Sequence, residues 1–208
     1  GDITLSVLPH ERPSGMTGFV MNTRRDLFSD WRVREALITA FNFEFINEAI
    51  TGSAQPRITS YFSNSPLGMR PGPAEGRVLE FLERYSDALL PGAIEGYELP
   101  VSDGTERNRA GTARALELLE EAGWTVQDGT LKDAGGNDFA FDILLQTGAS
   151  ENQAIIDMYV QSLGRIGISP TVSAVDAAQF KERTDVYDFD ITYFRRGLSL
   201  SPGNEQYL

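Results

Sequence analysis

The segment 18–41 constrains the fold more than any other part of the chain, because a strand, a turn and a helix follow one another directly. Residues 19–21 form an apolar run typical of a buried strand, which ends at the polar pair Asn22 and Thr23. Residues 31–41 repeat apolar side chains at three- and four-residue spacing, which predicts a helix with one buried face. Ligands of open α/β sheets gather beyond the carboxyl ends of strands, so we expect Asn22 in a ligand site.

Capping residues define the ends of two neighbouring helices. Ser29 or Asp30 is expected to accept a hydrogen bond from the first turn of the helix at 31–41. Asn42 is expected to cap a second helix, which Gly52 ends in a left-handed conformation.

The rest of the chain alternates between the two periodicities of secondary structure. The patterns predict helices over residues 76–90, 108–122, 150–166 and 177–184, and strands over residues 124–127, 130–132, 139–146, 171–175 and 188–194. Residues 66–76 and 91–106 are expected to be loops, because they are irregular and the first is rich in proline and glycine. Strands that alternate with helices indicate an α/β protein with a mixed sheet flanked by helices.

The composition excludes several classes of partner. The formal net charge of −12 disfavours nucleic acid, whose phosphates require a basic surface, and it disfavours anionic lipid headgroups for the same reason. The chain has no cysteine, which excludes disulfides, iron–sulfur ligation and thiol catalysis. Its apolar residues amount to 41% and form no stretch long enough to span a bilayer.

Sequence signatures of catalysis and metal binding are missing. His10 is the only histidine and has no second histidine or cysteine with which to hold a metal, so we interpret it as a linker residue and predict no metal and no cofactor. The pair Asp188 and Asp190 could be proposed for acid–base chemistry, but two close carboxylates need a proton or a cation between them. We expect Asp188 at a turn and only Asp190 partly enclosed, and we do not predict an enzyme.

Arginines gather after two of the predicted strands. They are Arg24, Arg25, Arg32 and Arg34 after the first strand and Arg195 and Arg196 after the last. A guanidinium group binds carboxylates and phosphates through two parallel hydrogen bonds, so such a basic rim could hold an anionic ligand. We assign Arg24, Arg195 and Arg196 to the ligand, and we expect Arg32 and Arg34 to be solvated or to make ordinary ion pairs with neighbouring carboxylates.

Two aromatic pairs have two readings that the residues alone leave open. Tyr61 and Phe62, followed by the amide of Asn64, could stack on and hydrogen-bond a ligand, or they could seal the edge of the core. Tyr193 and Phe194, at the end of the last predicted strand, have the same ambiguity.

Several separated motifs resemble one known family. These are Phe-Val-Met-Asn-Thr-Arg-Arg at 19–25, Phe-Glu-Phe-Ile-Asn at 43–47, Ser-Tyr-Phe-Ser-Asn-Ser at 60–65 and Leu-Ser-Leu-Ser-Pro-Gly-Asn-Glu-Gln at 198–206. They are similar to the YejA branch of the family 5 extracellular solute-binding proteins, the peptide- and nickel-type receptors of ABC importers. That branch is associated with the uptake of oligopeptides and microcin C.

The resemblance implies one lobe of a type II periplasmic binding protein with a peptide-binding fold. Residues 1–17 would connect the two lobes, residues 18–197 would form a single α/β ligand-binding lobe, and residues 198–208 would return towards the missing lobe. Residues 8–12 and 198–204 would lie at the hinge. The implied partners are a peptide-like ligand, the missing second lobe and the importer's membrane subunits, and the implied location is the periplasm, with the signal peptide outside this segment.

The ligand is expected to contact polar, aromatic and basic side chains. The predicted ligand-binding residues are Asn22, Arg24, Tyr61, Phe62, Asn64, Tyr193, Phe194, Arg195, Arg196 and Ser199. Related dipeptide and oligopeptide binders hold the ligand's α-ammonium with an aspartate a few residues after an aromatic, but residues 194–201 contain no aspartate. A modified peptide or a different ligand orientation is therefore expected. Receptors for nickel, an opine or a sugar, a sensor or adaptor that docks a protein, and a hydrolase are the alternatives.

Overall fold

The computed structural model describes Ser6, Leu8, residues 10–201 and Gly203 of the 208-residue chain. Its contacts divide the chain into two compact units. We call the larger one, Phe19–Pro56 and Leu99–Tyr193, the sheet unit, and the other, Gly1–Gly18, Arg57–Glu98 and Phe194–Leu208, the α3 unit. The single lobe predicted over residues 18–197 stays a prediction.

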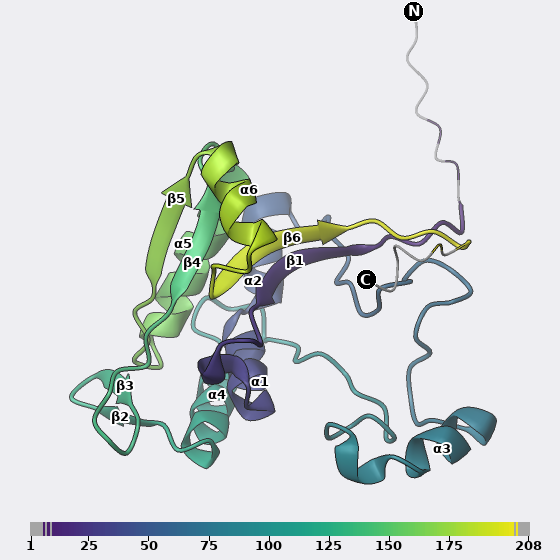
Figure 1. Cartoon of the computed structure of the whole chain (residues 1–208), viewed down its shortest axis with the longest axis horizontal. Coiled ribbons are helices and arrows are strands. Elements are labelled where there is room, and N and C mark those ends of the chain that lie inside the picture. The colour runs from purple at the N-terminus through teal and green to yellow at the C-terminus, as the bar shows by residue number, and fades with distance from the viewer. Residues whose placement is uncertain (1–5, 7, 9, 202, 204–208) are drawn as a thin grey trace, which may run out of the picture. The chain divides into compact units, whose positions relative to one another are not determined.

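A mixed sheet organises the larger unit (Figure 1). Within the described residues the sheet has four strands, β1 (Met16–Met21), β4 (Asp142–Gln146), β5 (Thr171–Val175) and β6 (Ile191–Arg196), in the order β1-β6-β4-β5. The first residues of β1, up to Gly18, and the last residues of β6, from Phe194, belong to the α3 unit. β4 pairs in parallel with both neighbours, so that Ile143 lies opposite Val172 on β5 and Ile191 on β6. Three successive residues of β4, from Ile143 to Leu145, are buried, as expected for a central parallel strand with both faces covered.

The strand β1 runs antiparallel to β6. The backbone N–H of Asn22, just after β1, donates to the carbonyl oxygen of Asp190, just before β6 (2.8 Å). At the other end, Gly15, just before β1, lies against the backbone of Arg196, the last residue of β6. The sheet is therefore mixed, as the sequence predicts.

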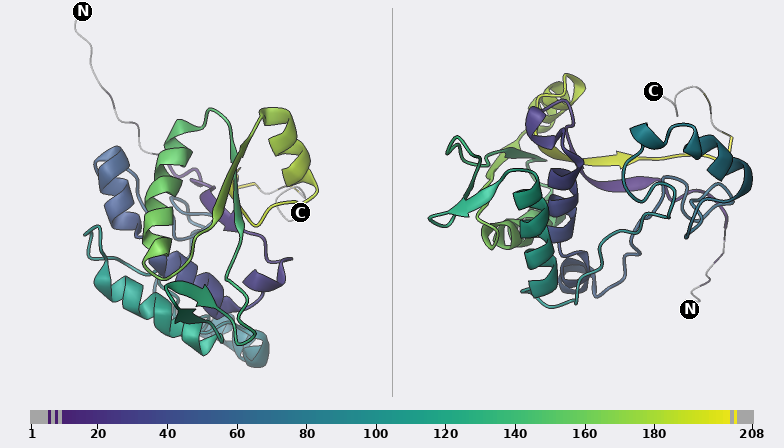
Figure 2. Two further views of the ribbon diagram at one scale, coloured as in Figure 1. Left: turned by 90° about the vertical axis from the view of Figure 1, so that its left-hand side faces the viewer. Right: turned by 90° about the horizontal axis from the view of Figure 1, so that it is seen from below.

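Two crossover helices cover opposite faces of this sheet. α5 (Ser150–Gly164) leads from β4 to β5, and α6 (Ala177–Asp185) leads from β5 back across β4 to β6. Crossovers between parallel strands are right-handed, so connections that run in opposite directions across a sheet place their helices on opposite faces. Figures 1 and 2, which view the chain from different directions, show α5 and α6 on either side of β4.

The remaining elements of the sheet unit enclose its core. They are the 3-10 turn η1 (Asp26–Phe28), the helices α1 (Trp31–Ala40), α2 (Phe43–Thr51) and α4 (Arg109–Glu121), and the antiparallel hairpin of β2 (Thr125–Gln127) and β3 (Thr130–Lys132). The hairpin has the Asp128-Gly129 turn that the sequence predicts. Among the described residues, no helix has the length and apolar character needed to cross a membrane.

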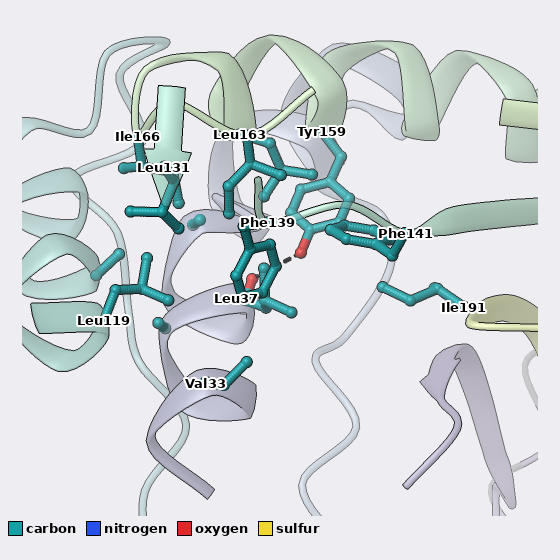
Figure 3. Close-up of a cluster of buried hydrophobic side chains, with 14 of the residues drawn as sticks. Val33, Leu37, Leu119, Leu131, Phe139, Phe141, Tyr159, Leu163, Ile166 and Ile191 are labelled. Atoms are coloured by element: carbon teal, nitrogen blue, oxygen red, sulfur yellow. Dashed lines mark hydrogen bonds between the residues drawn. The ribbon is translucent and has the colours of Figure 1, made fainter. Parts of the chain in front are cut away.

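The core is built where α1, α4 and α5 meet the sheet (Figure 3). Leu37, Leu119, Leu131 and Leu163 are fully buried there, together with the rings of Phe139, Phe141 and Tyr159. Full burial of each large apolar side chain contributes about 1.5–3 kcal/mol. The Tyr159 hydroxyl donates to the carbonyl oxygen of Leu37 (3.0 Å), one of the last four carbonyls of α1, which lack partners within the helix.

The helix caps confirm two predictions and correct a third. The Asp30 carboxylate accepts from the backbone N–H of Arg32 (2.9 Å), and Gly52 is left-handed with φ of 62°. Asn42 does precede α2, but it is itself left-handed with φ of 51° and makes no side-chain cap. Its amide nitrogen instead donates to the carbonyl oxygen of Thr105 (2.9 Å), so the side chain ties α2 to the loop before α4.

Some element boundaries differ from the sequence prediction for identifiable reasons. The helix predicted over 76–90 is α3 (Gly76–Glu83) followed by a separate 3-10 turn, η2 (Ser86–Ala88). The strand predicted over 139–146 begins only at Asp142, because the backbone N–H of Phe139 donates to Leu131 of the hairpin (2.8 Å). The strands predicted around residues 18–23 and 188–194 are each displaced by about two residues, as β1 and β6 show.

Tyr159→Phe should lower the free energy of unfolding by about 1 kcal/mol, because it leaves the Leu37 carbonyl without its buried donor. Burial raises the pKa of the Tyr159 hydroxyl, so the group remains a neutral donor at physiological pH. Urea denaturation of the variant measures the loss. The matched control is Tyr187→Phe, whose ring is half exposed and which should change stability by less than about 0.5 kcal/mol. Equal losses in both variants would contradict the assignment.

Candidate functional site

The carboxyl ends of the parallel strands form one edge of the sheet. β4 ends at Gln146, which is exposed like Thr147 and Gly148 after it, and α5 begins at Ser150. β5 ends at Val175, and α6 follows immediately. We call residues 146–150 together with Val175 and Asp176 the carboxyl edge.

The two connections of the carboxyl edge diverge from each other. The backbone N–H of Thr147 donates to the carbonyl oxygen of Val175 (2.7 Å), so β4 and β5 stay paired up to this point. Their loops then leave for helices on opposite faces of the sheet. Such a topological switch point is where open α/β sheets bind ligands, because the divergent loops leave the strand ends accessible.

The two helices that start at this edge differ in their caps. The Asp176 carboxylate accepts from the backbone N–H groups of Ala178 and Gln179 (both 2.9 Å), so α6 is capped by its own chain. At the corresponding place before α5 stands Ala149, and no described side chain caps that helix. The backbone N–H of Ser150 donates to the carbonyl oxygen of Gly148 (3.0 Å), so the donors left in the first turn are those of the following residues, Glu151 among them. These donors and the positive end of the helix dipole suit a carboxylate or another anion.

The strand β6 also ends on this side of the sheet. Tyr193 is half-buried, and its ring packs edge-on against Phe19 with centroids 6.0 Å apart. Tyr193 thus contributes to packing, which was one of its two predicted roles. Beyond it, Phe194 is 47% exposed and Arg195 is exposed.

Asn22 and Arg24 lie at the opposite end of β6 from Arg195 and Arg196. Because β1 is antiparallel to β6, the residues after β1 lie beside the start of β6. The two groups of arginines predicted for one ligand therefore adjoin opposite ends of β6. The sequence could not reveal this, because it does not show the relative direction of two strands so far apart in the chain.

The Asn22 side chain is occupied by the backbone around the start of β6. It is 4% exposed, and its amide nitrogen donates to the carbonyl oxygens of Tyr187 and Phe189 (both 2.9 Å). Its amide oxygen accepts from the backbone N–H of Arg24 (3.1 Å). These contacts hold Tyr187 in a left-handed conformation with φ of 58°. A role of Asn22 in ligand contact stays a prediction.

The arginines after β1 contact the protein itself. The Arg24 guanidinium stacks on the ring of Tyr187, 3.7 Å from its centroid. Arg25 bridges Asp188 (3.3 Å) and Asp190 (3.1 Å), and Arg183 also pairs with Asp188 (3.0 Å), so cations compensate both neighbouring carboxylates. As the sequence predicts, Asp190 is the more enclosed of the two, with 26% of its side chain exposed against 56% for Asp188.

Arg32 and Arg34 also hold local structure, as the sequence predicts. Arg32 pairs with Asp30 (2.6 Å), and this hydrogen bond lowers the pKa of the Asp30 carboxyl below its usual value. Arg34 donates to the carbonyl oxygens of Phe28 (2.7 Å) and Ser29 (2.8 Å). An ion pair of Arg34 with a neighbouring carboxylate stays a prediction.

The predicted contacts in the α3 unit are of mixed exposure. Tyr61 is 55% exposed and Phe62 is half-buried. Asn64 is left-handed, and its amide nitrogen donates to the carbonyl oxygens of His10 (3.0 Å) and Arg12 (2.9 Å), so it ties the chain before β1 to its own loop.

The other residues of the α3 unit that the sequence singled out have local partners. Ser199 is exposed and donates to the carbonyl oxygen of Ser201 (3.0 Å). His10 accepts from the backbone N–H of Arg12 (3.2 Å). In the described part of the chain, no group of three or more histidine, aspartate or glutamate side chains is arranged to hold a metal.

Sequence reasoning missed the loop Gln146–Ser150. Its signal was present, because an apolar strand is followed there by a polar residue, a glycine and a helix start. The same pattern directed attention to Asn22, where the strand proved to run the other way.

A comparison with known protein families identifies the class to which the chain belongs. The model of the bacterial extracellular solute-binding proteins, family 5 Middle, matches residues 2–208. The chain belongs to this family.

Two relatives from Agrobacterium fabrum support the predicted branch. The chain is 38% identical over 207 residues to the peptidoglycan-binding protein YepA, covering 99% of this chain and 33% of YepA. It is 35% identical over 193 residues to the probable peptide-binding protein YejA, covering 92% of this chain and 31% of YejA. The chain thus spans about a third of the length of these relatives.

Solved structures confirm the predicted fold class. The oligopeptide-binding protein AppA from Bacillus subtilis, in complex with a nonapeptide, matches with a TM-score of 0.62 and 21% identity over 89% of this chain and 32% of AppA. NikA from Brucella suis, in complex with Fe(III)-EDTA, matches with a TM-score of 0.62 and 18% identity over 92% of this chain and 33% of NikA. These proteins share the mixed α/β fold of type II peptide-binding proteins.

Gly15→Ala should loosen the pairing between the start of β1 and the end of β6. Gly15 has φ of +71°, and a β-carbon there would collide with the carbonyl oxygen of Arg196. Hydrogen exchange of the β1 and β6 amides should become at least about tenfold faster. That factor corresponds to the lower end of the free-energy cost of such backbone strain.

Gly18→Ala is the matched control, because Gly18 is in the same strand and a β-carbon there meets no atom within 4 Å. Its exchange should remain close to that of the unchanged chain. If Gly15→Ala exchanges as slowly as Gly18→Ala, the close approach of Gly15 to Arg196 is refuted.

Proposed function

We propose that this chain is the ligand-binding part of a receptor that captures peptide-like solutes for an ABC importer. One observation carries the proposal: the carboxyl edge of β4 and β5 combines a topological switch point with the uncapped first turn of α5. That edge offers backbone donors to a carboxylate, and the exposed Gln146 and Thr147 offer hydrogen bonds to peptide groups. A peptide with a free or side-chain carboxylate is the ligand class that this chemistry suits.

The chemistry around the end of β6 narrows the kind of peptide. Residues 194–201 contain no aspartate that could pair with an α-ammonium group, whereas Arg195 and Arg196 are cations. A peptide whose amino end is blocked by an amide fits this better than a peptide with a free amine. The peptide stem of peptidoglycan is of that kind, because its first residue is joined to the sugar through an amide bond, and the name of the relative YepA supports this choice.

The mechanism of capture would be closure of two lobes around the ligand. A ligand that contacts both lobes shifts an equilibrium between open and closed states by its differential affinity for the closed one. In this proposal residues 18–197 form one lobe, residues 1–17 and 198–208 lead towards the missing lobe, and the hinge lies at 8–12 and 198–204. The importer's membrane subunits would recognise the closed form in the periplasm, and no covalent chemistry would be required.

The 208-residue chain alone should bind a peptide only weakly. A dissociation constant of about 1 μM corresponds to about −8 kcal/mol, and sharing the contacts between two lobes would leave one lobe with a dissociation constant of about 1 mM or weaker. Titration calorimetry with an N-acetylated pentapeptide should therefore show no micromolar binding. Micromolar affinity of this chain alone would contradict a cleft shared between lobes.

Gly148→Asp should weaken that millimolar binding by about fivefold or more, because it places a negative charge at the first turn of α5. Chemical shifts of the amides at 146–151, followed by NMR during peptide titration, measure the effect. Gly129→Asp is the matched control: Gly129 has φ of +80° and Gly148 has φ of +89°, and a β-carbon at either position meets no atom within 4 Å.

The same titration identifies the ligand group and tests the alternatives. A peptide amidated at its carboxyl end should lose most of the effect, since the carboxylate is the proposed partner of α5. Shifts confined to other parts of the chain, or equal weakening by both aspartates, would refute the carboxyl edge as the site. Saturable binding of nickel, an opine or a sugar at the same amides, with none by peptides, would favour the other receptor classes.

A further inference from the structure

The two units differ sharply in how they bury apolar side chains. Among the described residues, all buried hydrophobic side chains belong to the sheet unit. The segment Arg57–Glu98 of the α3 unit contributes none, although it contains several large apolar residues. This segment therefore lacks the core that normally stabilises helices and loops in a folded domain.

The helix α3 presents an exposed apolar face. Val78 and Phe81 of α3 are 60% and 58% exposed, and Tyr85, two residues after the helix ends at Glu83, is 54% exposed. The rings of Phe81 and Tyr85 contact each other, with centroids 5.2 Å apart. We call these three side chains the α3 face. Single exposed apolar residues are normal on protein surfaces, but a group of them on one short segment marks a contact surface.

The length of α3 strengthens this argument. It has eight residues, and its preceding residue Glu75 provides no side-chain cap. Isolated helices shorter than about 12–15 residues are marginal in water, so most of their stability in proteins comes from packing of an apolar face. Leu79 and Leu82 on the other side of α3 are only half-buried, so a partner surface over the α3 face would add to the stability of the helix.

We propose that the α3 face is covered by the part of the longer receptor polypeptide that lies outside these 208 residues. This rests on the proposed function, in which a second lobe completes the receptor, and it names the surface that this further chain contacts. Relatives are about three times as long as the matched region. In those relatives further chain continues from at least one end of the matched region, and the described residues 10–18 and 194–201 of this chain both belong to the α3 unit.

Hydrogen exchange in two proteins, both without peptide, tests the proposal. One is the 208-residue chain, and the other is a chimera in which this chain replaces the matched region of Agrobacterium YepA. We expect the amides of residues 77–85 to exchange at least about a hundredfold more slowly in the chimera than in the chain alone. The amides of α4, in the sheet unit, serve as the internal control and should be protected in both.

A pair of substitutions tests the contact by side chain. Phe81→Ser should leave the unfolding of the 208-residue chain unchanged and should remove the additional protection of α3 in the chimera. Val126→Ser is the matched control, since Val126 is 47% exposed in the sheet unit and should change neither protein. If the chimera does not fold, exchange in unmodified YepA over the aligned segment provides the second measurement.

Three outcomes would overturn the proposal. Protection of residues 77–85 in the 208-residue chain at all concentrations would mean that the chain covers the α3 face itself. Protection that rises with concentration would identify a second copy as the partner. Rapid exchange of the aligned segment in full-length YepA would show that nothing covers it. Because no peptide is present, failure of the ligand proposal would leave the expected protection unchanged, so the two failures are distinguishable.

Discussion

The burial of β4 on both faces is the constraint on which the rest of the sheet unit depends. Ile143 and Leu145 contribute to the main core, and Leu144 between them is fully buried on the other face of the sheet. A strand buried on both faces needs a cover on each, which α5 and α6 provide. This requirement sends the connections after β4 and β5 in opposite directions, and that divergence creates the accessible carboxyl edge.

Three arginines after β1 support the scaffold of the sheet unit, whereas the start of α5 is left without a side-chain cap. Arg25, Arg32 and Arg34 are held by carboxylates or carbonyl groups of their own unit. Such pairs at half-exposed positions contribute little to stability, and their value lies in fixing the turns between β1 and α1. The uncapped start of α5 has no such internal partner among the described side chains. Its donors are therefore the feature of this unit best suited to a ligand.

Family membership and fold do not choose the ligand, because neighbours with this fold were solved with a nonapeptide and with Fe(III)-EDTA. The choice depends on a few groups at the strand ends. In the proposed function those groups would be backbone donors and an amide, with Arg195 and Arg196 following β6. The chain spans about a third of the length of its relatives, and the proposal of a longer receptor would account for the uneven burial of its apolar side chains.

The sequence by itself determined the elements whose signals are local. The periodicity of α1, the cap at Asp30, the left-handed Gly52 and the bounds of β5 could all be predicted, because each depends on residues within a few positions of one another. The family could also be recognised from short motifs. Only the tertiary structure decided the direction of β1 against β6, the separation of the two arginine groups and the enclosure of the Asn22 amide by Tyr187 and Phe189. Those contacts join residues about 165 positions apart, and side-chain periodicity shows which face of a strand is buried but not which strand lies beside it or in which direction it runs.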